Sequence, residues 1–140
     1  MASAPDGQAL VLIGEDEPDN QIILQTVVES LVGVRAEVAG NGLAVLASVS
    51  RKRPTVILLD LMMPVMNGFD FIRELRKNKE WQDIPVVILT AKDLTVEDRQ
   101  QLKGNVERIL QKGDYNREQL LSEVRELVKH QVQPEAPAKS

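Results

Sequence analysis

The chain has 140 residues, of which 43% are hydrophobic and 27% charged, and its net charge is −4. This length suits a single domain with a sizeable core, and the composition is ordinary for a globular protein. The acidic balance and the lack of an extended Lys/Arg cluster argue against a nucleic-acid surface. Without cysteines there is no disulfide or thiolate chemistry, and no apolar run approaches the length of a membrane span. We therefore expect a cytoplasmic protein that binds neither nucleic acid nor membrane.

Apolar runs and helically spaced apolar residues alternate along the chain, after a polar, flexible lead at residues 1–8. The expected strands are 9–13, 34–38, 56–59, 86–89 and 106–110. The expected helices are 18–31, 43–49, 69–79, 94–103 and 116–130, of which 94–103 is short and highly charged. Residues 131–140 are rich in Pro and Ala and are expected to be a disordered tail, so the folded domain is predicted to span 9–130.

Five strands that alternate with five helices predict a parallel sheet covered on both faces. The strand at 56–59 has four consecutive apolar residues, which is typical of a central strand buried on both sides. The strands at 34–38 and 106–110 contain charged residues and are therefore expected at the two edges. With right-handed crossovers, the predicted strand order is 2-1-3-4-5, a doubly wound, flavodoxin-like fold of three α/β/α layers.

Polar side chains follow four of the five predicted strands, at the point where each strand ends. The carboxyl ends of parallel strands share one edge of the sheet, and ligands bind there where the strand order reverses. The residues expected to meet at this edge are Glu15, Asp16, Asp60, Thr90 and Lys112. Three carboxylates this close repel one another unless they are protonated or hold a cation.

A few carboxylate oxygens suit Mg²⁺, which keeps several waters and favours a phosphoryl oxygen as a further ligand. Lys112 adds a point charge suited to a phosphoryl group, and Thr90 adds a hydroxyl donor. Asp60 directly follows the central strand and is therefore the candidate reactive group. A carboxylate supported by Mg²⁺ and a lysine is equipped to accept a phosphoryl group covalently.

From about residue 9 to residue 129 the chain resembles the receiver domains of two-component response regulators. The motifs that carry the resemblance are Glu15-Asp16, Asp60-Leu61-Met62-Met63-Pro64 with Gly68, Thr90-Ala91, and Lys112. Each motif alone is weak, but the ordered set at strand ends is highly specific. The resemblance implies that Asp60 accepts a phosphoryl group from the phosphohistidine of a histidine kinase or a histidine phosphotransfer protein.

The same resemblance implies roles for the other residues of the motifs. These roles are Mg²⁺ ligation by Asp16, Asp60 and the backbone carbonyl of Met62, a water-mediated Mg²⁺ contact by Glu15, and phosphoryl binding by Thr90 and Lys112. The phosphorylated chain is then expected to be a monomeric signalling module, not an enzyme, that acts through contacts with a downstream protein. Too few residues follow the last helix for an effector domain, unless the chain is one piece of a longer protein.

Three positions depart from the commonest pattern of this family. Glu15 stands where Asp is more usual, Ile109 stands three residues before the lysine where Tyr or Phe is usual, and Gly113 replaces the following proline. Ile109 has no ring or hydroxyl and is stiff at χ1, so it cannot reproduce an aromatic switch. A cis bond is much more costly before glycine than before proline, so the Lys112–Gly113 bond is either trans or cis at a cost of ~3 kcal/mol.

Three other functions are compatible with a sheet of this order. A phosphatase with an aspartyl nucleophile would need a second acid two residues after Asp60, where Met62 stands. A flavodoxin-like FMN binder would need a phosphate loop rich in Ser, Thr and Gly, whereas the three acids at 15–17 would repel a phosphate. A degenerate receiver that only binds partners would lack the acceptor or the lysine, and both are present. His130, the only histidine, is interpreted as structural.

Overall fold

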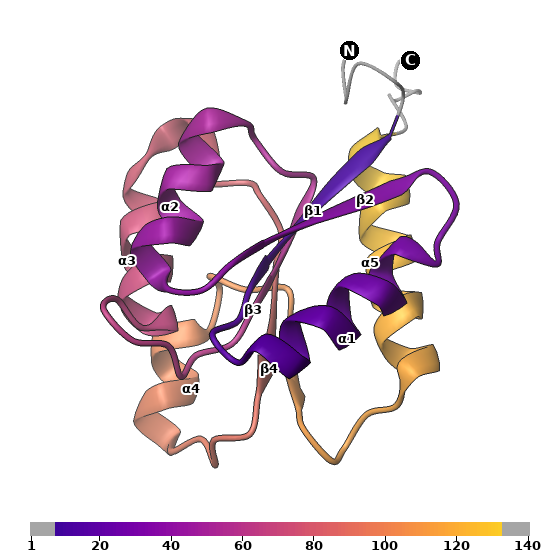
Figure 1. The fold of residues 1–140 in the computed structure, drawn as a ribbon. Helices are drawn as coiled ribbons and strands as arrows, with labels where there is room; N and C mark the ends of the chain where they lie inside the picture. Colours follow the sequence, from indigo (N-terminus) through magenta and orange to yellow (C-terminus); the bar gives the residue numbers. More distant parts are fainter. Residues whose placement is uncertain (1–7, 133–140) are drawn as a thin grey trace.

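A computed structural model of the chain describes residues 8–132 (Figure 1). The lead and the tail expected from the sequence fall almost wholly outside the described residues, at 1–7 and 133–140. The elements are β1 (Ala9–Gly14), α1 (Pro18–Glu29), β2 (Val34–Ala39), α2 (Gly42–Arg51), β3 (Val56–Leu59), α3 (Gly68–Lys77), η1 (Lys79–Trp81), β4 (Val86–Thr90), α4 (Val96–Leu102), β5 (Arg108–Gln111) and α5 (Arg117–Val132). All ten predicted strands and helices are present, and the short 3₁₀ helix η1 lies in the connector before β4.

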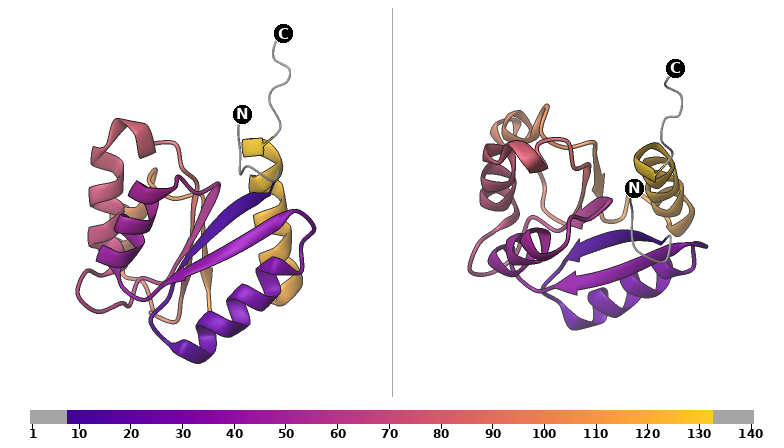
Figure 2. Two further views of the ribbon diagram at one scale, coloured as in Figure 1. Left: turned by 45° about the horizontal axis from the view of Figure 1, so that its top comes forward. Right: turned by 90° about the horizontal axis from the view of Figure 1, so that it is seen from above.

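The five strands form one parallel sheet in the predicted order, β2-β1-β3-β4-β5. Figures 1 and 2 show α1 and α5 on one face of the sheet and α2, α3 and α4 on the other. An apolar core fills each space between helices and sheet, and Phe71 and Leu75 of α3 are fully buried in the larger one. All four residues of β3 are buried because both of its faces are covered. The carboxyl ends of β1 and β3, where the strand order reverses, are therefore supported from both sides.

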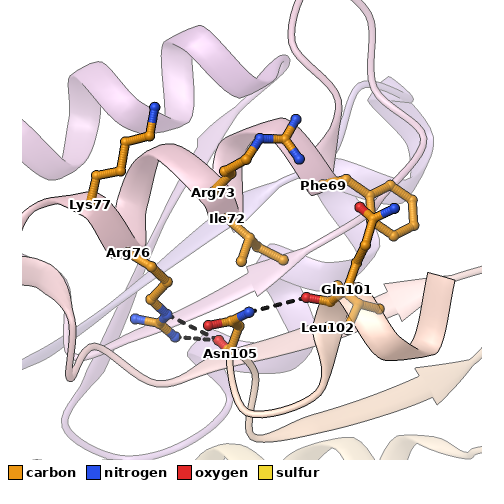
Figure 3. A pocket seen from close by; sticks show the side chains of 8 residues that line it. All are labelled: Phe69, Ile72, Arg73, Arg76, Lys77, Gln101, Leu102 and Asn105. Carbon is orange, nitrogen blue, oxygen red and sulfur yellow. Dashed lines mark hydrogen bonds between the residues drawn. The ribbon is translucent and has the colours of Figure 1, made fainter. Parts of the chain in front are cut away.

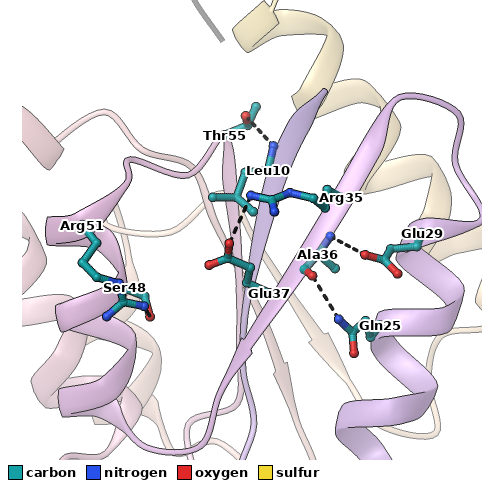
Figure 4. Close-up of polar contacts among 9 residues, drawn as sticks. All are labelled: Leu10, Gln25, Glu29, Arg35, Ala36, Glu37, Ser48, Arg51 and Thr55. Carbon is teal, nitrogen blue, oxygen red and sulfur yellow. Dashed lines mark hydrogen bonds and ion pairs between the residues drawn. The ribbon is translucent and has the colours of Figure 1, made fainter. Parts of the chain in front are cut away.

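Side chains of α1 form hydrogen bonds with the backbone of the edge strand β2 (Figure 4). Gln25 Nε2 donates to the Ala36 carbonyl at 3.0 Å, and Glu29 Oε2 accepts from the Ala36 N–H at 2.9 Å. Arg35 and Glu37 form an ion pair along the same strand. Bonded backbone groups and charges on an edge discourage pairing with a strand of another molecule. The β2 edge is thus protected against strand addition.

Arg76, near the end of α3, fastens the loop between α4 and β5 (Figure 3). Its Nε and Nη2 donate to the Asn105 carbonyl at 3.1 and 2.6 Å, and its Nη1 donates to the carbonyls of Trp81 and Gln82, both at 3.0 Å. Burial lowers the pKa of the Arg76 guanidinium from its usual value. A cavity of about 330 Å³ beside Arg76 lies between α3 and α4, and its lining includes none of the residues predicted to act chemically.

The fourth helix begins later than predicted. Within the expected range 94–103, only Val96–Leu102 is helical, because Thr95 is its N-cap. The Asp98 N–H donates to Thr95 Oγ1 at 3.0 Å, and the Thr95 N–H donates to Asp98 Oδ2 at 3.0 Å. This reciprocal pair satisfies two backbone donors at the start of a helix of only seven residues.

The other boundaries differ from the predicted ones by at most two residues. β5 begins at Arg108 instead of 106. Its partner strand β4 begins at Val86, and the first residue pair between the two strands joins Val87 to Arg108. α5 continues through Val132, two residues past the expected end of the domain. Within residues 8–132, none of the helices combines the length and the apolar character that a bilayer crossing requires.

Val65, in the loop between β3 and α3, adopts an unfavourable backbone conformation. Its φ is 68°, in the left-handed region, and the Met66 N–H donates across it to the Pro64 carbonyl at 2.7 Å. A β-branched side chain is disfavoured at such φ values. The residue is 75% exposed, so burial of its side chain offers little compensation. The tight turn after Asp60 is therefore locally strained.

Replacing Val65 with glycine should raise the free energy of unfolding by about 1 kcal/mol. Relief of the strain should contribute about 1–3 kcal/mol, and the greater freedom of glycine in the unfolded chain should remove about 0.4–1 kcal/mol of that gain. Urea denaturation measures the change. Val32→Gly, at an exposed valine without positive φ, serves as the control and should not stabilise the protein. A Val65→Gly midpoint at or below that of the wild type would contradict the assignment of strain.

Candidate functional site

Two carboxylates lie side by side because of the register between β1 and β3. Gly14 pairs with Leu59, so the next residues, Glu15 and Asp60, leave the sheet at the same level. The Asp60 N–H donates to the Gly14 carbonyl at 2.9 Å and extends the strand pairing to this point. Both side chains are buried, with 1% of Glu15 and 9% of Asp60 exposed. The sheet thus holds two acidic groups out of water and next to each other.

Asp16 completes a cluster of three acids, although it is exposed where Glu15 and Asp60 are buried. One carboxylate oxygen from each residue lies within 4.8 Å of the other two. Oxygen atoms of this kind are the ligands that hard divalent cations prefer. The cluster could therefore hold a metal ion, as the carboxyl-edge pattern predicts.

Pairing between β4 and β5 brings Thr90 and Lys112 to the same edge. The Lys112 N–H donates to the Thr90 carbonyl at 2.8 Å. Lys112 Nζ lies 3.8 Å from Glu15 Oε1 and 3.8 Å from Asp60 Oδ2. Thr90 is fully buried, and its hydroxyl accepts a hydrogen bond from the Lys92 N–H at 3.1 Å. Each strand end that was predicted to supply a polar group therefore supplies it at this edge.

Glu15 is the least satisfied charged group of the site. Its Oε2 accepts from the Glu17 N–H at 3.1 Å, whereas its Oε1 is buried and has no hydrogen bond among the described residues. Burial raises the pKa of the Glu15 carboxyl above its ordinary value; the Glu17 N–H lowers it, the Asp60 charge raises it further, and Lys112 lowers it. A buried anionic oxygen without a donor is costly, so a bound cation would stabilise this arrangement.

Asp60 is bonded at one oxygen and open at the other. Its Oδ1 accepts from the Met62 N–H at 3.0 Å, while its Oδ2 lies 3.8 Å from Lys112 Nζ and has no hydrogen bond within residues 8–132. Met62 is an exposed residue, and the part of it that is bonded to Asp60 is its backbone N–H. The bonded oxygen fixes the orientation of the carboxylate and leaves Oδ2 available to a ligand.

Tyr115, in the loop after β5, was not singled out by the sequence patterns. It is partly buried and packs against the core between the sheet and the helices α1 and α5. Burial raises the pKa of its phenol, and the negative charges of Glu15 and Asp60 raise it further. In the commonest family pattern an aromatic residue stands three positions before the lysine, where this chain has Ile109, whereas its single tyrosine stands three positions after Lys112.

The bond between Lys112 and Gly113 is trans, since residues 8–132 contain no cis peptide. Gly113 has a φ of 97°, which glycine adopts without steric cost. Of the cis and trans forms that the sequence left open for this bond, the structure contains the trans form, which is the less costly one. Gly113 thus forms the turn after Lys112, in which the Asp114 N–H donates to the Gln111 carbonyl at 2.9 Å.

The family model for the response regulator receiver domain matches residues 11–125 of this chain. The chain therefore belongs to the response regulator receiver domain family. It is 41% identical over 97 residues to the probable transcriptional regulatory protein TcrX of Mycobacterium tuberculosis, an alignment that covers 67% of this chain and 39% of TcrX. The chain thus spans well under half of the length of that curated relative.

Two solved structures resemble the fold over nearly their whole length. The receiver domain of the Francisella response regulator 1452 gives a TM-score of 0.77 at 28% identity, covering 88% of this chain and 98% of that one. The receiver domain of the sensor histidine kinase PA1611 from Pseudomonas aeruginosa, which has a magnesium ion coordinated in its active site cleft, gives 0.73 at 26% identity, covering 89% and 98%. The predicted fold class and family are confirmed.

Replacing Glu15 with glutamine should stabilise the metal-free protein most at neutral pH. The pKa of the Glu15 carboxyl is higher in the folded state than its ordinary value of 4.5. The stability that this carboxyl contributes is therefore fully present below pH 4.5 and is lost as the pH rises through its pKa in the folded protein. Glutamine does not titrate and keeps an acceptor for the Glu17 N–H. Urea unfolding in EDTA, from about pH 4 to about pH 8, should show the advantage of the variant growing with pH. A constant difference across this range would contradict the assignment.

Proposed function

We propose that Asp60 accepts a phosphoryl group from the phosphohistidine of a histidine kinase or a histidine phosphotransfer protein, and that the phosphorylated chain signals through contacts with a downstream protein. One observation carries the proposal: the buried Asp60 carboxylate has two further carboxylates within 4.8 Å and an ammonium group at 3.8 Å. Membership of a family that works with histidine kinases supports it. The chain is then a signalling module, with residues 9–130 as the domain, acting as a monomer in the cytoplasm.

The transfer exchanges one bond to phosphorus for another. A carboxylate oxygen of Asp60 forms a bond to phosphorus while the phosphorus–nitrogen bond of the donor breaks, and the electron pair of that bond returns to the imidazole. Oδ1 is held by the Met62 N–H, so Oδ2, which faces Lys112, is the oxygen presented to the donor. Catalysis of this kind consists mainly of alignment and charge compensation. The Lys112 ammonium and the Thr90 hydroxyl are the groups proposed to bind the phosphoryl oxygens.

Mg²⁺ is the proposed cofactor, because the donor set consists of oxygen atoms only. Asp16, Asp60 and the backbone carbonyl of Met62 would hold it, and Glu15 would contact it through water. When bound, it would offset the mutual repulsion of the carboxylates and the charge of the phosphoryl oxygens. The buried Oε1 of Glu15, which has no hydrogen bond among the described residues, supports a cation at this position.

Incubation with acetyl phosphate and Mg²⁺ should add a single phosphoryl group, which intact-mass spectrometry detects. Asp60→Asn should remove the adduct, because an amide oxygen is a far weaker nucleophile than a carboxylate. Asp93→Asn, at an exposed aspartate in the β4–α4 loop, is the matched control and should keep the adduct. An undiminished adduct on the Asp60→Asn variant would refute Asp60 as the acceptor.

Millimolar Mg²⁺ should raise the melting temperature, because a ligand bound only by the folded state stabilises it. The gain is about 2.7 kcal/mol when the free ligand reaches about 100 times its Kd. Asp16→Asn should lose most of this response, because the cluster loses one of its three carboxylates. Differential scanning calorimetry of both proteins measures the effect, and an equal response in both would contradict the proposed ligand set.

The fluorescence of Trp81 offers a positional control for the metal experiment. Trp81 ends η1, which precedes β4, and thus lies at the amino ends of the strands, away from the carboxylates. Its emission should barely change on Mg²⁺ addition. Strong quenching would place the cation somewhere other than the carboxyl edge.

A further inference from the structure

Lys92, in the loop between β4 and α4, is held at three points. Its N–H donates to Thr90 Oγ1 at 3.1 Å, and its carbonyl accepts from Gln111 Nε2 at 2.9 Å. Its ammonium group lies 2.8 Å from Asp98 Oδ2, in a partly buried ion pair. Thr90 belongs to the proposed phosphoryl site, Gln111 ends β5, and Asp98 lies in the first turn of α4. One loop residue thus joins the site, the edge strand and the helix.

Gln111 reaches Lys92 because of the register of the sheet. It pairs with Thr90 across β4 and β5, so its backbone lies level with that residue. The other end of its amide, Oε1, lies 3.4 Å from Arg99 Nη2 on α4, which turns Nε2 toward the loop. Ile109, two residues earlier in β5, packs against the apolar core and offers no polar group. Within β5, Gln111 is therefore the residue that bonds to the loop.

The helix α4 is coupled closely to Lys92 and only loosely to the core. Asp98, which binds the Lys92 ammonium, also forms the reciprocal cap with Thr95. Only one residue of α4, Leu102, is buried. A short helix with so little buried surface can shift at low cost, and its first turn moves together with the group that binds it.

We propose that the side-chain amide of Gln111, through its bond to the Lys92 carbonyl, couples phosphorylation of Asp60 to the position of α4. This inference rests on the proposed function. When the Thr90 hydroxyl turns to a phosphoryl oxygen, it releases the Lys92 N–H, and the adjoining peptide moves. Gln111 holds the carbonyl of the same residue, so the loop turns about that fixed point. The ion pair with Asp98 transmits this rotation to α4.

A ligand shifts a conformational equilibrium only through contacts that differ between the two states. The differing contact proposed here is the bond from Lys92 N–H to Thr90 Oγ1, which breaks when the Thr90 side chain rotates to donate to a phosphoryl oxygen. The bond from Gln111 converts the release of that N–H into a directed motion. Without the amide, the loop should respond to the ligand while α4 stays in place.

NMR amide spectra with beryllofluoride and Mg²⁺, which together mimic the phosphoryl group, test the inference. In the wild type we expect shifts around Asp60 and across residues 91–102. Gln111→Met keeps an unbranched side chain but removes the amide; the shifts around Asp60 should remain, while those of Val96–Leu102 should fall at least about twofold. Gln111→Glu, which cannot donate to a carbonyl, should give the same loss. Gln100→Met, at an exposed glutamine of α4, is the matched control and should behave as the wild type.

The outcomes separate the two claims. If the amide shifts of α4 on beryllofluoride binding were as large in both Gln111 variants as in the wild type, the role of Gln111 would be overturned and the proposed function would stand. A change of rotamer at the Ile109 methyls on binding would also overturn it, because the signal would then pass through that side chain. Absence of shifts around Asp60 in the wild type would instead refute the proposed phosphoryl site.

Discussion

The burial of two like charges, Glu15 and Asp60, at the ends of adjacent strands is the constraint on which the site and its chemistry depend. At about 5 Å and an effective dielectric constant of about 20, two such charges repel by roughly 3 kcal/mol. Lys112 Nζ, at 3.8 Å from each, compensates part of this repulsion but donates a hydrogen bond to neither. The surrounding sheet holds the carboxylates of the metal-free site in place, and their uncompensated negative charge favours the binding of a cation.

The central strands provide the rigidity that this arrangement needs. β1 and β3 are buried throughout, and the N–H of Asp60 is bonded to the carbonyl of Gly14, so the two acids cannot separate without breaking the strand pairing. Gly14 itself leaves no room for a side chain: an added Cβ would lie 2.8 Å from Leu59 Cδ1 and 2.9 Å from Val45 Cγ2. The polar cluster is thus attached to two fully buried strands, whereas the motion that we propose takes place in the β4–α4 loop.

Most of the fold and the convergence of the site could be predicted from the sequence, because both follow from strand periodicity and from the rule that parallel strands end at one edge. The interactions of Gln111 could not be predicted. They depend on the exact register of β5, which was expected at 106–110 and lies at Arg108–Gln111. The register places Gln111 level with Thr90, and the course of the β4–α4 loop brings the Lys92 carbonyl within reach of its amide; strand periodicity specifies neither. The proximity of Tyr115 to the acids likewise depends on how an irregular loop folds back.

Borohydride trapping shows directly whether Asp60 carries the phosphoryl group, because it identifies the modified residue in the sequence. Borohydride reduces an aspartyl phosphate to homoserine, a permanent change that peptide mass spectrometry can place. After phosphorylation from a phosphohistidine donor with Mg²⁺, we expect homoserine at position 60 and at no other aspartate. Reduction at Asp16, or a phosphorylated protein whose residue 60 remains aspartate, would contradict it.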